Sequence, residues 1–303
     1  SRPGKGSAGR SGAGVRAPWR ERWYGLDVIR CRTLGFGKNH FWDRSLRSAA
    51  VCTTLTAALA RHVRRGDVVM VVMAPGLLSW AAVQAARLRG ARVALLAYDI
   101  FPDNLVPTGV VRPNSPLLRT LQRLYHPIYR QVDAVLVLGR DMAELVRELG
   151  GPGCAPVVVS HHWADLSEVG PLGPEETSLR AEFGIEEDRF VFLFAGNLGR
   201  VQALDAVAEA MALLRGDSRL LALFVGAGAG QKRLEETVAR HGLDNVMLRP
   251  ILPRQSQRRL MATADVGLVT FCPGMLGMGV AGKTPNLLAA GKPILAMLDP
   301  GAE

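Results

Sequence analysis

The chain has 303 residues, of which 48% are hydrophobic and 21% charged, so its composition excludes a disordered protein and predicts a globular one of about two domains. Its net charge is +10, which excludes a strongly acidic, disordered chain. No run of about 20 apolar residues occurs, so the sequence offers no candidate for a membrane-spanning helix.

The two ends of the sequence are unusual. Residues 1–18 consist mainly of Ser, Gly, Arg, Pro and Ala without an apolar face, and we predict a disordered tail there. Glu303 directly follows a predicted strand, where a doubly wound domain would rarely stop. We therefore expect a fragment that lacks both ends.

The first half alternates predicted strands and helices, which indicates a parallel sheet covered by helices. Strands are predicted at 26–31, 67–73, 93–97, 134–138 and 157–160, and helices at 46–62, 78–88, 116–129 and 141–149. Aromatic and arginine residues alternate in 19–24, and we interpret the aromatics as packed rather than as a membrane contact. His126, on the apolar side of the third helix, is also expected to be packed.

The first half is also the basic half. Residues 1–150 carry 23 basic and 10 acidic residues, whereas 151–303 carry 14 and 17. This asymmetry favours an anionic partner such as a phosphorylated lipid, a membrane surface or a nucleic acid. An arginine-rich composition unrelated to binding is the alternative, and both remain open. The four cysteines are scattered without a metal-binding spacing and fit a reducing compartment.

The second half repeats the alternation after a linker rich in Pro, Gly and Glu. Strands are predicted at 190–195, 220–225, 246–248, 266–271 and 293–298, and helices at 201–214, 232–241, 253–264 and 285–290. The fold class is therefore α/β, with two Rossmann-like domains facing a cleft that the chain crosses near 163–176. The domains are predicted at 19–164 and 189–303, with the linker at 165–188.

Three glycine-bearing loops, 196–200, 226–230 and 274–283, fall at the carboxyl ends of strands in the second half, where such sheets bind ligands. Gly196 and Gly199 separate a buried strand from a helix predicted to start at once. That arrangement exposes backbone N–H groups suited to phosphate. A simple strand-to-helix packing turn is the alternative reading.

Residues 277–284 satisfy the P-loop pattern G-x4-G-K-T. We reject a P-loop NTPase, because residues 272–276 separate the pattern from its strand and Pro285 stands where the helix should continue. A glycine loop with Lys283 ahead of a helix remains, and it suits an anionic diphosphate. The alternative is a solvated lysine.

Asp99 and the pair His161-His162 are considered as site residues because of where they lie in the predicted fold. Asp99 follows a strand at its carboxyl end and can accept a proton from a hydroxyl or orient a substrate, unless it only caps the loop. The adjacent pair His161 and His162 is not expected to bind metal, because neighbouring side chains on an extended segment point apart. We place the pair at the interdomain hinge.

Four segments carry a resemblance to a known family. They are DIFPD at 99–103, SHHWAD at 160–165, FAGNLGRVQAL at 194–204 and AGKTPNLLAAGKPIL at 281–295. Together and in this order they resemble the motifs of family 4 retaining glycosyltransferases of the GT-B fold. Within that family the chain resembles bacterial enzymes that build O-antigen, capsule and colanic-acid-like polysaccharides.

The resemblance implies a site for a nucleotide-sugar, a UDP-sugar, in the second domain. The implied donor-binding residues are Gly196, Asn197, Gly199, Arg200, Gly226, Gly228, Lys283 and Asn286. The implied catalytic residues are Asp99, Arg200 and Lys283, with no metal and no cofactor, because cationic side chains neutralise the leaving diphosphate. The first domain would take a polyprenyl-diphosphate-linked or glycan acceptor, at the inner face of the plasma membrane and without nucleic acid.

The chain departs from the family pattern in several places. Asn286 stands where the family has a glutamate for the ribose, and His161-His162 replaces Pro-Asn at the crossing. The first strand with its glycine loop, and the closing C-terminal helices, are expected to be missing, so the fragment is expected to have lost activity. Two alternatives stay open: a UDP-sugar epimerase of GT-B fold, and a non-catalytic nucleotide-sugar or polyanion-binding protein.

Overall fold

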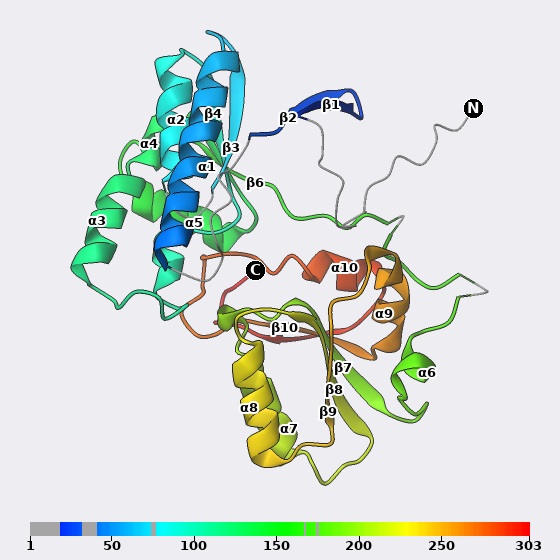
Figure 1. Cartoon of the computed structure of the whole chain (residues 1–303). Helices are drawn as coiled ribbons and strands as arrows, with labels where there is room; N and C mark the ends of the chain where they lie inside the picture. Colours follow the sequence, from blue (N-terminus) through cyan, green and yellow to red (C-terminus); the bar gives the residue numbers. More distant parts are fainter. Residues whose placement is uncertain (1–18, 32–40, 74–76, 167, 174–175) are drawn as a thin grey trace, which may run out of the picture.

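The computed structural model describes residues 19–31, 41–73, 77–166, 168–173 and 176–303, with the backbone alone for 41–48. The predicted tail at 1–18 and the predicted break at 74–76 lie outside the described residues. Two separate parallel sheets form two bodies, one above the other in Figure 1. The prediction of two α/β domains rather than one continuous sheet is confirmed.

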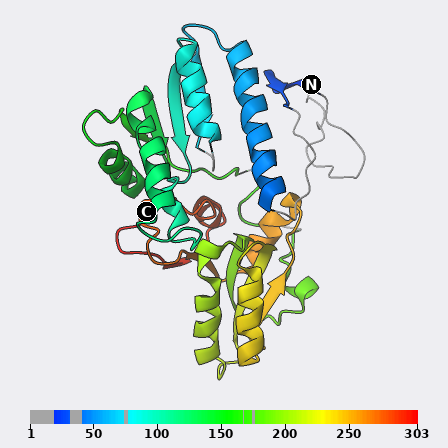
Figure 2. The same ribbon diagram turned by 60° about the vertical axis from the view of Figure 1, so that its left-hand side comes forward.

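The first body is a four-stranded sheet in the order β3-β4-β5-β6. Its strands are β3 (Val68–Val72), β4 (Arg92–Ala97), β5 (Ala134–Val137) and β6 (Val157–Val159), and its helices are α1 (Phe41–His62), α2 (Leu78–Leu88), α3 (Pro116–Tyr125), α4 (Ile128–Gln131) and α5 (Arg140–Gly150). The strands are runs of Val, Leu and Ala, and their fully buried side chains, such as Leu95 and Val135, form the core with α2 and α5. The helix α1 lies alongside α2 (Figure 2).

The helix predicted at 116–129 is broken in two. Ser115 caps α3 by accepting a hydrogen bond from the backbone N–H of Leu118 at 3.2 Å. Pro127 has no N–H and ends the regular hydrogen-bond pattern, so α4 begins separately at Ile128. His126 lies at this break and is not simply packed, because its Nε2 lies 2.9 Å from Asp103 Oδ2.

A separate hairpin precedes this body. Strands β1 (Arg20–Trp23) and β2 (Leu26–Ile29) pair antiparallel around Tyr24 and Gly25, which both have positive φ angles. The interpretation of its aromatics as packed is wrong. Trp19, Trp23 and Tyr24 are 48%, 53% and 87% exposed, because the hairpin projects away from both sheets (Figure 1).

The second body is a five-stranded sheet in the order β11-β10-β7-β8-β9. Its strands are β7 (Phe190–Asn197), β8 (Leu220–Ala227), β9 (Val246–Arg249), β10 (Val266–Thr270) and β11 (Ile294–Met297), and its helices are α6 (Arg180–Phe183), α7 (Leu204–Leu213), α8 (Gln231–His241), α9 (Gln257–Thr263) and α10 (Thr284–Ala289). Apolar residues of α7 and α8 cover one face, and those of α9 and α10 cover the other. The chain adds β8 and β9 on one side of β7, and then returns to add β10 and β11 on the other side of β7.

The switch point of the sheet therefore lies between β7 and β10, where open α/β sheets bind their ligands. The predicted linker at 165–188 is partly packed onto this body. Its buried Arg180 binds Asp265 Oδ2 at 2.7 Å, and the same oxygen accepts the N–H of Val191 at 2.7 Å. This shared carboxylate fixes the end of the linker beside the start of β7.

One loop of the second body, residues 271–283, reaches into the first, and we call it the bridging loop. The N–H of Ile100 donates to Met278 O at 3.1 Å, and Asp99 and Gly279 form an antiparallel bridge. Met278 and Val280 pack against the core of the first body. The two bodies are thus joined by backbone hydrogen bonds and apolar contact.

The loop after β8 depends on glycine. Gly226 has a φ of +155°, and a Cβ atom there would lie 1.8 Å from Gly196 O. We expect Gly226→Ala to lower the free energy of unfolding by about 2 kcal/mol or more, since the clash is with backbone. Gly216→Ala is the control, because a Cβ at Gly216 meets nothing within 4 Å. Urea unfolding measures both, and equal midpoints would contradict the expected clash.

Candidate active site

The turn after β7 differs from its prediction. Residues Arg200–Gln202 form a single 3₁₀ turn, Ala203 has a φ of +46°, and α7 begins only at Leu204. The prediction of a helix N-terminus directly after Gly199 is therefore wrong. The turn is held against the end of β10, because Cys272 N donates to Val201 O at 2.7 Å. It lies at the switch point between β7 and β10.

The glycines of 226–230 allow this turn and the loop after β8 to touch. A Cβ at Gly228 would lie 2.4 Å from Leu198 O, and one at Gly230 would lie 2.7 Å from Gly199 O. Two backbone hydrogen bonds join the loops, Leu198 N to Ala227 O at 3.0 Å and Gly230 N to Leu198 O at 2.7 Å. Close backbone packing therefore accounts for Gly226 and Gly228, and their contact with a donor stays a prediction.

Lys283 ends the bridging loop and points back toward this turn. Its Nζ donates to Gln202 Oε1 at 3.2 Å and lies 3.2 Å from the centre of the Phe194 ring. Burial lowers the pKa of Lys283 to about 7, and none of the described carboxylates forms an ion pair with it. The reading of Lys283 as a solvated lysine is wrong. A half-buried ammonium with one neutral hydrogen-bond acceptor is arranged to receive an anion.

Asp99 lies where the two bodies meet. A Cβ placed on Gly279 would lie 3.2 Å from Asp99 Oδ1, so the carboxylate lies directly against the bridging loop. Partial burial raises the pKa of Asp99 above its usual value, although the residue keeps an exposed edge. The side chain is thus both reachable from solvent and easier to protonate than an ordinary aspartate.

Asp103 fixes the segment that follows Asp99. Its oxygens accept hydrogen bonds from Gln122 Nε2 at 2.8 Å and from His126 Nε2 at 2.9 Å. Burial raises the pKa of Asp103, but these two hydrogen bonds outweigh that effect and hold the pKa below its usual value. Sequence reasoning placed Asp103 in a motif and gave it no partner, because Gln122 and His126 lie 19 and 23 residues further along the chain and no local pattern links them to Asp103.

The two histidines follow β6 and contact residues of both bodies, and their role as an interdomain hinge stays a prediction. The rings of His162 and Tyr98 stack at 5.3 Å, and a Cβ on Gly282 would lie 3.6 Å from His162 Nε2. His161 Nε2 lies 3.3 Å from Glu303 Oε1. The two rings therefore have different partners. In the described part of the chain, no group of three or more His, Cys, Asp or Glu residues is placed to hold a metal ion.

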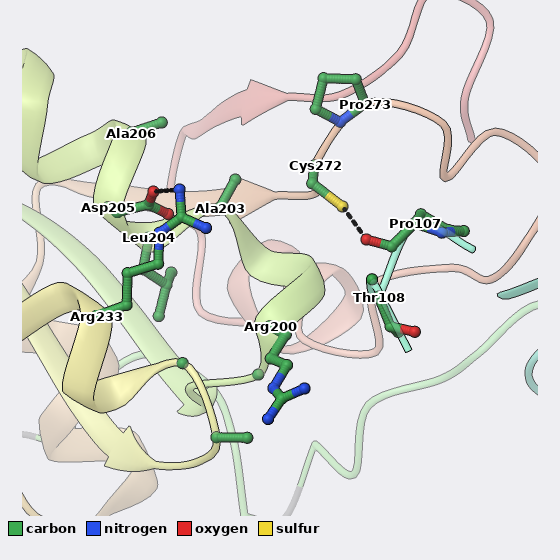
Figure 3. A pocket seen from close by; sticks show the side chains of 14 residues that line it. Pro107, Thr108, Arg200, Ala203, Leu204, Asp205, Ala206, Arg233, Cys272 and Pro273 are labelled. Atoms are coloured by element: carbon green, nitrogen blue, oxygen red, sulfur yellow. Dashed lines mark hydrogen bonds and ion pairs between the residues drawn. The ribbon is translucent and has the colours of Figure 1, made fainter. Parts of the chain in front are cut away.

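A pocket of about 540 Å³ lies between the bodies, and Figure 3 shows its lining. The first body contributes the loop from Pro107 to Gly109. The second contributes the turn with Arg200, the starts of α7 and α8, and Cys272. Arg233 and Asp205 form an ion pair at 2.5 Å on one side, and Cys272 Sγ donates to Pro107 O at 3.6 Å on the other.

The structure brings together only part of the predicted site. Gly199 and Arg200 line the pocket, whereas Lys283 and Asp99 lie outside its lining. Asn286 lies in the short helix α10, three residues after Lys283, and no hydrogen bond of its side chain with another described residue is found. Sequence reasoning missed Arg233 and Asp205, since a charged pair in the first turns of two helices has no motif.

The comparisons with known proteins follow the same division of the chain. Residues 7–162 match the family described as glycosyl transferase 4-like domain, and residues 175–301 match glycosyl transferases group 1. The chain is 35% identical over 270 residues to the probable glycosyltransferase WbjE of Pseudomonas aeruginosa, covering 88% of this chain and 66% of the relative. It is 26% identical over 209 residues to the putative colanic acid biosynthesis glycosyl transferase WcaI of Escherichia coli strain K12, covering 68% and 51%.

The chain thus spans about half to two thirds of the length of these curated relatives. Among solved structures it is similar to sucrose-phosphate synthase of Thermosynechococcus elongatus, with a TM-score of 0.71, 16% identity, and coverage of 92% of this chain and 68% of that one. It is also similar to Anabaena HepE, solved in complex with UDP, with a TM-score of 0.61, 16% identity, and coverage of 85% and 71%. At these identities the structures show the fold, which is GT-B. The chain belongs to the glycosyltransferase family that joins a glycosyl transferase 4-like domain to a glycosyl transferases group 1 domain.

Proposed function

We propose that the protein transfers a sugar, with retention of configuration, from a UDP-sugar to a lipid-linked or glycan acceptor in bacterial cell-surface polysaccharide synthesis. The observation that carries this proposal is Lys283, a half-buried cation without a carboxylate partner at the switch point of the second sheet. A nucleotide diphosphate supplies the anion that this ammonium lacks. HepE, which shares the fold, was solved in complex with UDP, and the relative WcaI, a putative colanic acid biosynthesis glycosyl transferase, supports the polysaccharide role.

In this reaction the acceptor hydroxyl oxygen bonds to the anomeric carbon on the same face from which the diphosphate leaves, so that the configuration is retained while the bond from that carbon to the diphosphate breaks. The leaving diphosphate gains negative charge, so Lys283 binds it more tightly in the transition state than in the ground state. Arg200 supplies a second cation from the 200–202 turn, and the two side chains together neutralise the leaving diphosphate. Asp99 accepts the proton of the acceptor hydroxyl from the first body.

The direct test incubates the complete protein with a labelled UDP-sugar and a polyprenyl-diphosphate-linked sugar, with and without EDTA. A glycosylated acceptor that forms equally in EDTA is the expected product. Conversion of the nucleotide-sugar to its epimer would instead support the epimerase, and donor binding without turnover would support a binding protein. Either of these outcomes overturns the proposal.

Lys283 should matter more for turnover than for donor affinity. We expect Lys283→Ala to lower kcat by roughly 100-fold or more, the scale for losing one preorganised electrostatic group. Lys283→Arg should restore it only in part, because a planar guanidinium differs in geometry from an ammonium. Lys232→Ala is the control, since Lys232 is exposed and pairs with Glu236 within α8. Near-normal turnover in Lys283→Ala would remove Lys283 from the site.

The protonation of Lys283 gives an independent readout. Because its pKa is about 7 in the free protein, the side chain is mostly neutral at pH 8 and must take up a proton when it binds a diphosphate. Calorimetric titration with UDP in two buffers of different ionisation enthalpy should therefore show proton uptake at pH 8, and none in Lys283→Ala. Affinity for UDP should fall as the pH rises through 7.

Asp99 should set the acidic limb of the pH–rate profile. Since partial burial raises its pKa, the carboxylate becomes protonated, and activity falls, at a pH above the ordinary aspartate value of about 4. In Asp99→Asn we expect kcat to drop by about 100-fold and this limb to disappear. A profile of Asp99→Asn with an unchanged acidic limb would assign the limb to another group.

We further propose that the protein works peripherally at the inner face of the plasma membrane. In the described part of the chain, no helix is both long and apolar enough to cross a bilayer. The hairpin β1–β2 supports a surface contact, because exposed Trp23 and Tyr24 lie at its tip and exposed Arg20 and Arg22 lie along it. Aromatic rings favour the interface of a bilayer, and arginine favours anionic lipid.

Flotation with liposomes tests this contact. The complete protein should float with vesicles that contain anionic lipid, less so at high salt, and the double change Trp23→Ser and Tyr24→Ser should weaken flotation. Leu213→Ser is the control, because Leu213 is 88% exposed but lies at the end of α7 in the second body. Flotation that is insensitive to salt and to anionic lipid content would contradict the proposal.

A further inference from the structure

The bridging loop contains a run of consecutive backbone N–H groups, 274–277, that all donate to carboxylates. Asp299 Oδ2 accepts three of them at 2.9, 2.9 and 3.1 Å, from Gly274, Met275 and Leu276. Asp141 Oδ2 accepts the next one, from Gly277, at 3.1 Å. Hydrogen bonds to an ionised carboxylate are about twice as strong as those between neutral groups. We call Asp299 and Asp141 the carboxylate clamp of the loop.

The two carboxylates of the clamp belong to different bodies. Asp299 follows β11, the edge strand of the second sheet, whereas Asp141 lies in the first turn of α5 in the first body. In the described part of the chain, neither carboxylate forms an ion pair, so backbone N–H groups are what stabilises its charge. The bonds to Asp299 therefore shape the loop within its own body, and the bond to Asp141 attaches the loop to the other body.

The backbone of the loop is shaped to receive these carboxylates. Gly274 and Gly277 have φ angles of +86° and +70°, a conformation that favours glycine. Successive N–H groups next to such residues converge on one point and form a concavity that suits an anion. A Cβ atom at Gly277 would lie 3.0 Å from Asp141 O and 3.1 Å from Leu145 Cβ, so the loop also presses closely against α5.

The clamped run lies in the same loop as the residues that the proposed reaction uses. Met278 follows it and packs against the core of the first body, and Gly279 pairs with Asp99. Lys283 ends the loop and reaches Gln202. A shift of the clamped run would therefore move the contact with Asp99 and the ammonium of Lys283 together.

We propose that Asp299 and Asp141 are positioning residues, which hold the bridging loop so that Lys283 meets the leaving diphosphate while Asp99 faces the acceptor. The inference rests on the proposed function, because it explains how one loop serves both substrates. Neither carboxylate belongs to the lining of the pocket between the bodies, so each acts through the loop. Asp299 sets the shape of the loop, and Asp141 sets its place on the first body.

Amide hydrogen exchange of the complete protein tests the clamp without turnover. Asp299→Asn keeps the size of the side chain but removes its charge, and the amides of 274–276 should exchange roughly 10-fold faster, the scale of a weakened hydrogen bond to a charged group. Asp141→Asn should speed exchange at Gly277 and leave 274–276 unchanged. Unchanged exchange at 274–276 in Asp299→Asn would overturn the inference.

The matched control is Asp217→Asn. Asp217 Oδ1 also accepts hydrogen bonds, from the N–H and the Nε of Arg219 at 3.0 and 2.9 Å. This pair lies just before β8, at the amino end of the second sheet, whereas the bridging loop follows the carboxyl end of β10. Asp217→Asn should leave exchange at 274–277 at the wild-type rate, and faster exchange there would show that the effect is not specific to the clamp.

The titration of Lys283 is a second readout, followed by NMR of protein labelled at lysine. When the loop loses its shape, Lys283 leaves its contact with Phe194, and its pKa should rise from about 7 toward the ordinary lysine value. We expect this rise in Asp299→Asn. A general loss of stability would not shift the titration of the molecules that remain folded. An unchanged pKa of Lys283 in folded Asp299→Asn would overturn the positioning role.

Turnover completes the test. The kcat of Asp299→Asn should fall by roughly 10-fold, and the KM for the UDP-sugar should change less, because Lys283 acts mainly on the transition state. A fall in kcat without a rise in the pKa of Lys283 would overturn the inference, since Asp299 would then act by another route. If the wild-type protein transfers no sugar, the proposed function fails, whereas exchange and the Lys283 titration still decide whether the clamp holds the loop.

Discussion

The packing of the bridging loop into the first body is the contact on which the site depends. Met278 and Val280 come from the second body but pack against the core of the first, and Gly279 pairs with Asp99. The same loop ends at Lys283, which reaches Gln202 and Phe194 of the second body. One segment thus sets where a carboxylate of one body lies relative to a cation of the other, because it touches both.

The second constraint is the approach of two backbones at the carboxyl ends of β7 and β8. Gly226, Gly228 and Gly230 leave no space for a Cβ atom where these loops meet. The contact fixes the 200–202 turn, in which Gln202 accepts a hydrogen bond from Lys283 and Arg200 lines the pocket. Glycines that suggested a phosphate cradle therefore act first as packing elements, and they shape the site through the turn that they hold.

Lys283 shows why a buried cation is costly to keep. Burial against Phe194 disfavours its charged form, and the single acceptor Gln202 Oε1 compensates only in part. The cost to the folded state is fully present below about pH 7, and stability rises with pH between about 7 and the ordinary lysine value, because in that range the unfolded chain holds a proton that the buried side chain has released. A bound anion removes this penalty, so stability and ligand binding are linked at one side chain.

The sequence by itself determined the α/β class, the two bodies and most strand positions. These features depend on hydrophobic periodicity and composition, which are local and can be read from continuous apolar runs and from the glycines that interrupt them. It also proposed Asp99, Arg200 and Lys283 as site residues, and their roles stay predictions. It misplaced the start of α7 and the packing of Trp23 and Tyr24, since the local pattern does not state what covers a face or how a turn closes. Only the tertiary structure decided that Asp205 and Arg233 meet, that Asp103 binds His126, and that Lys283 reaches Gln202 in the turn that carries Arg200. These contacts join residues far apart in sequence, and their geometry follows from the packing of the two bodies rather than from any local pattern.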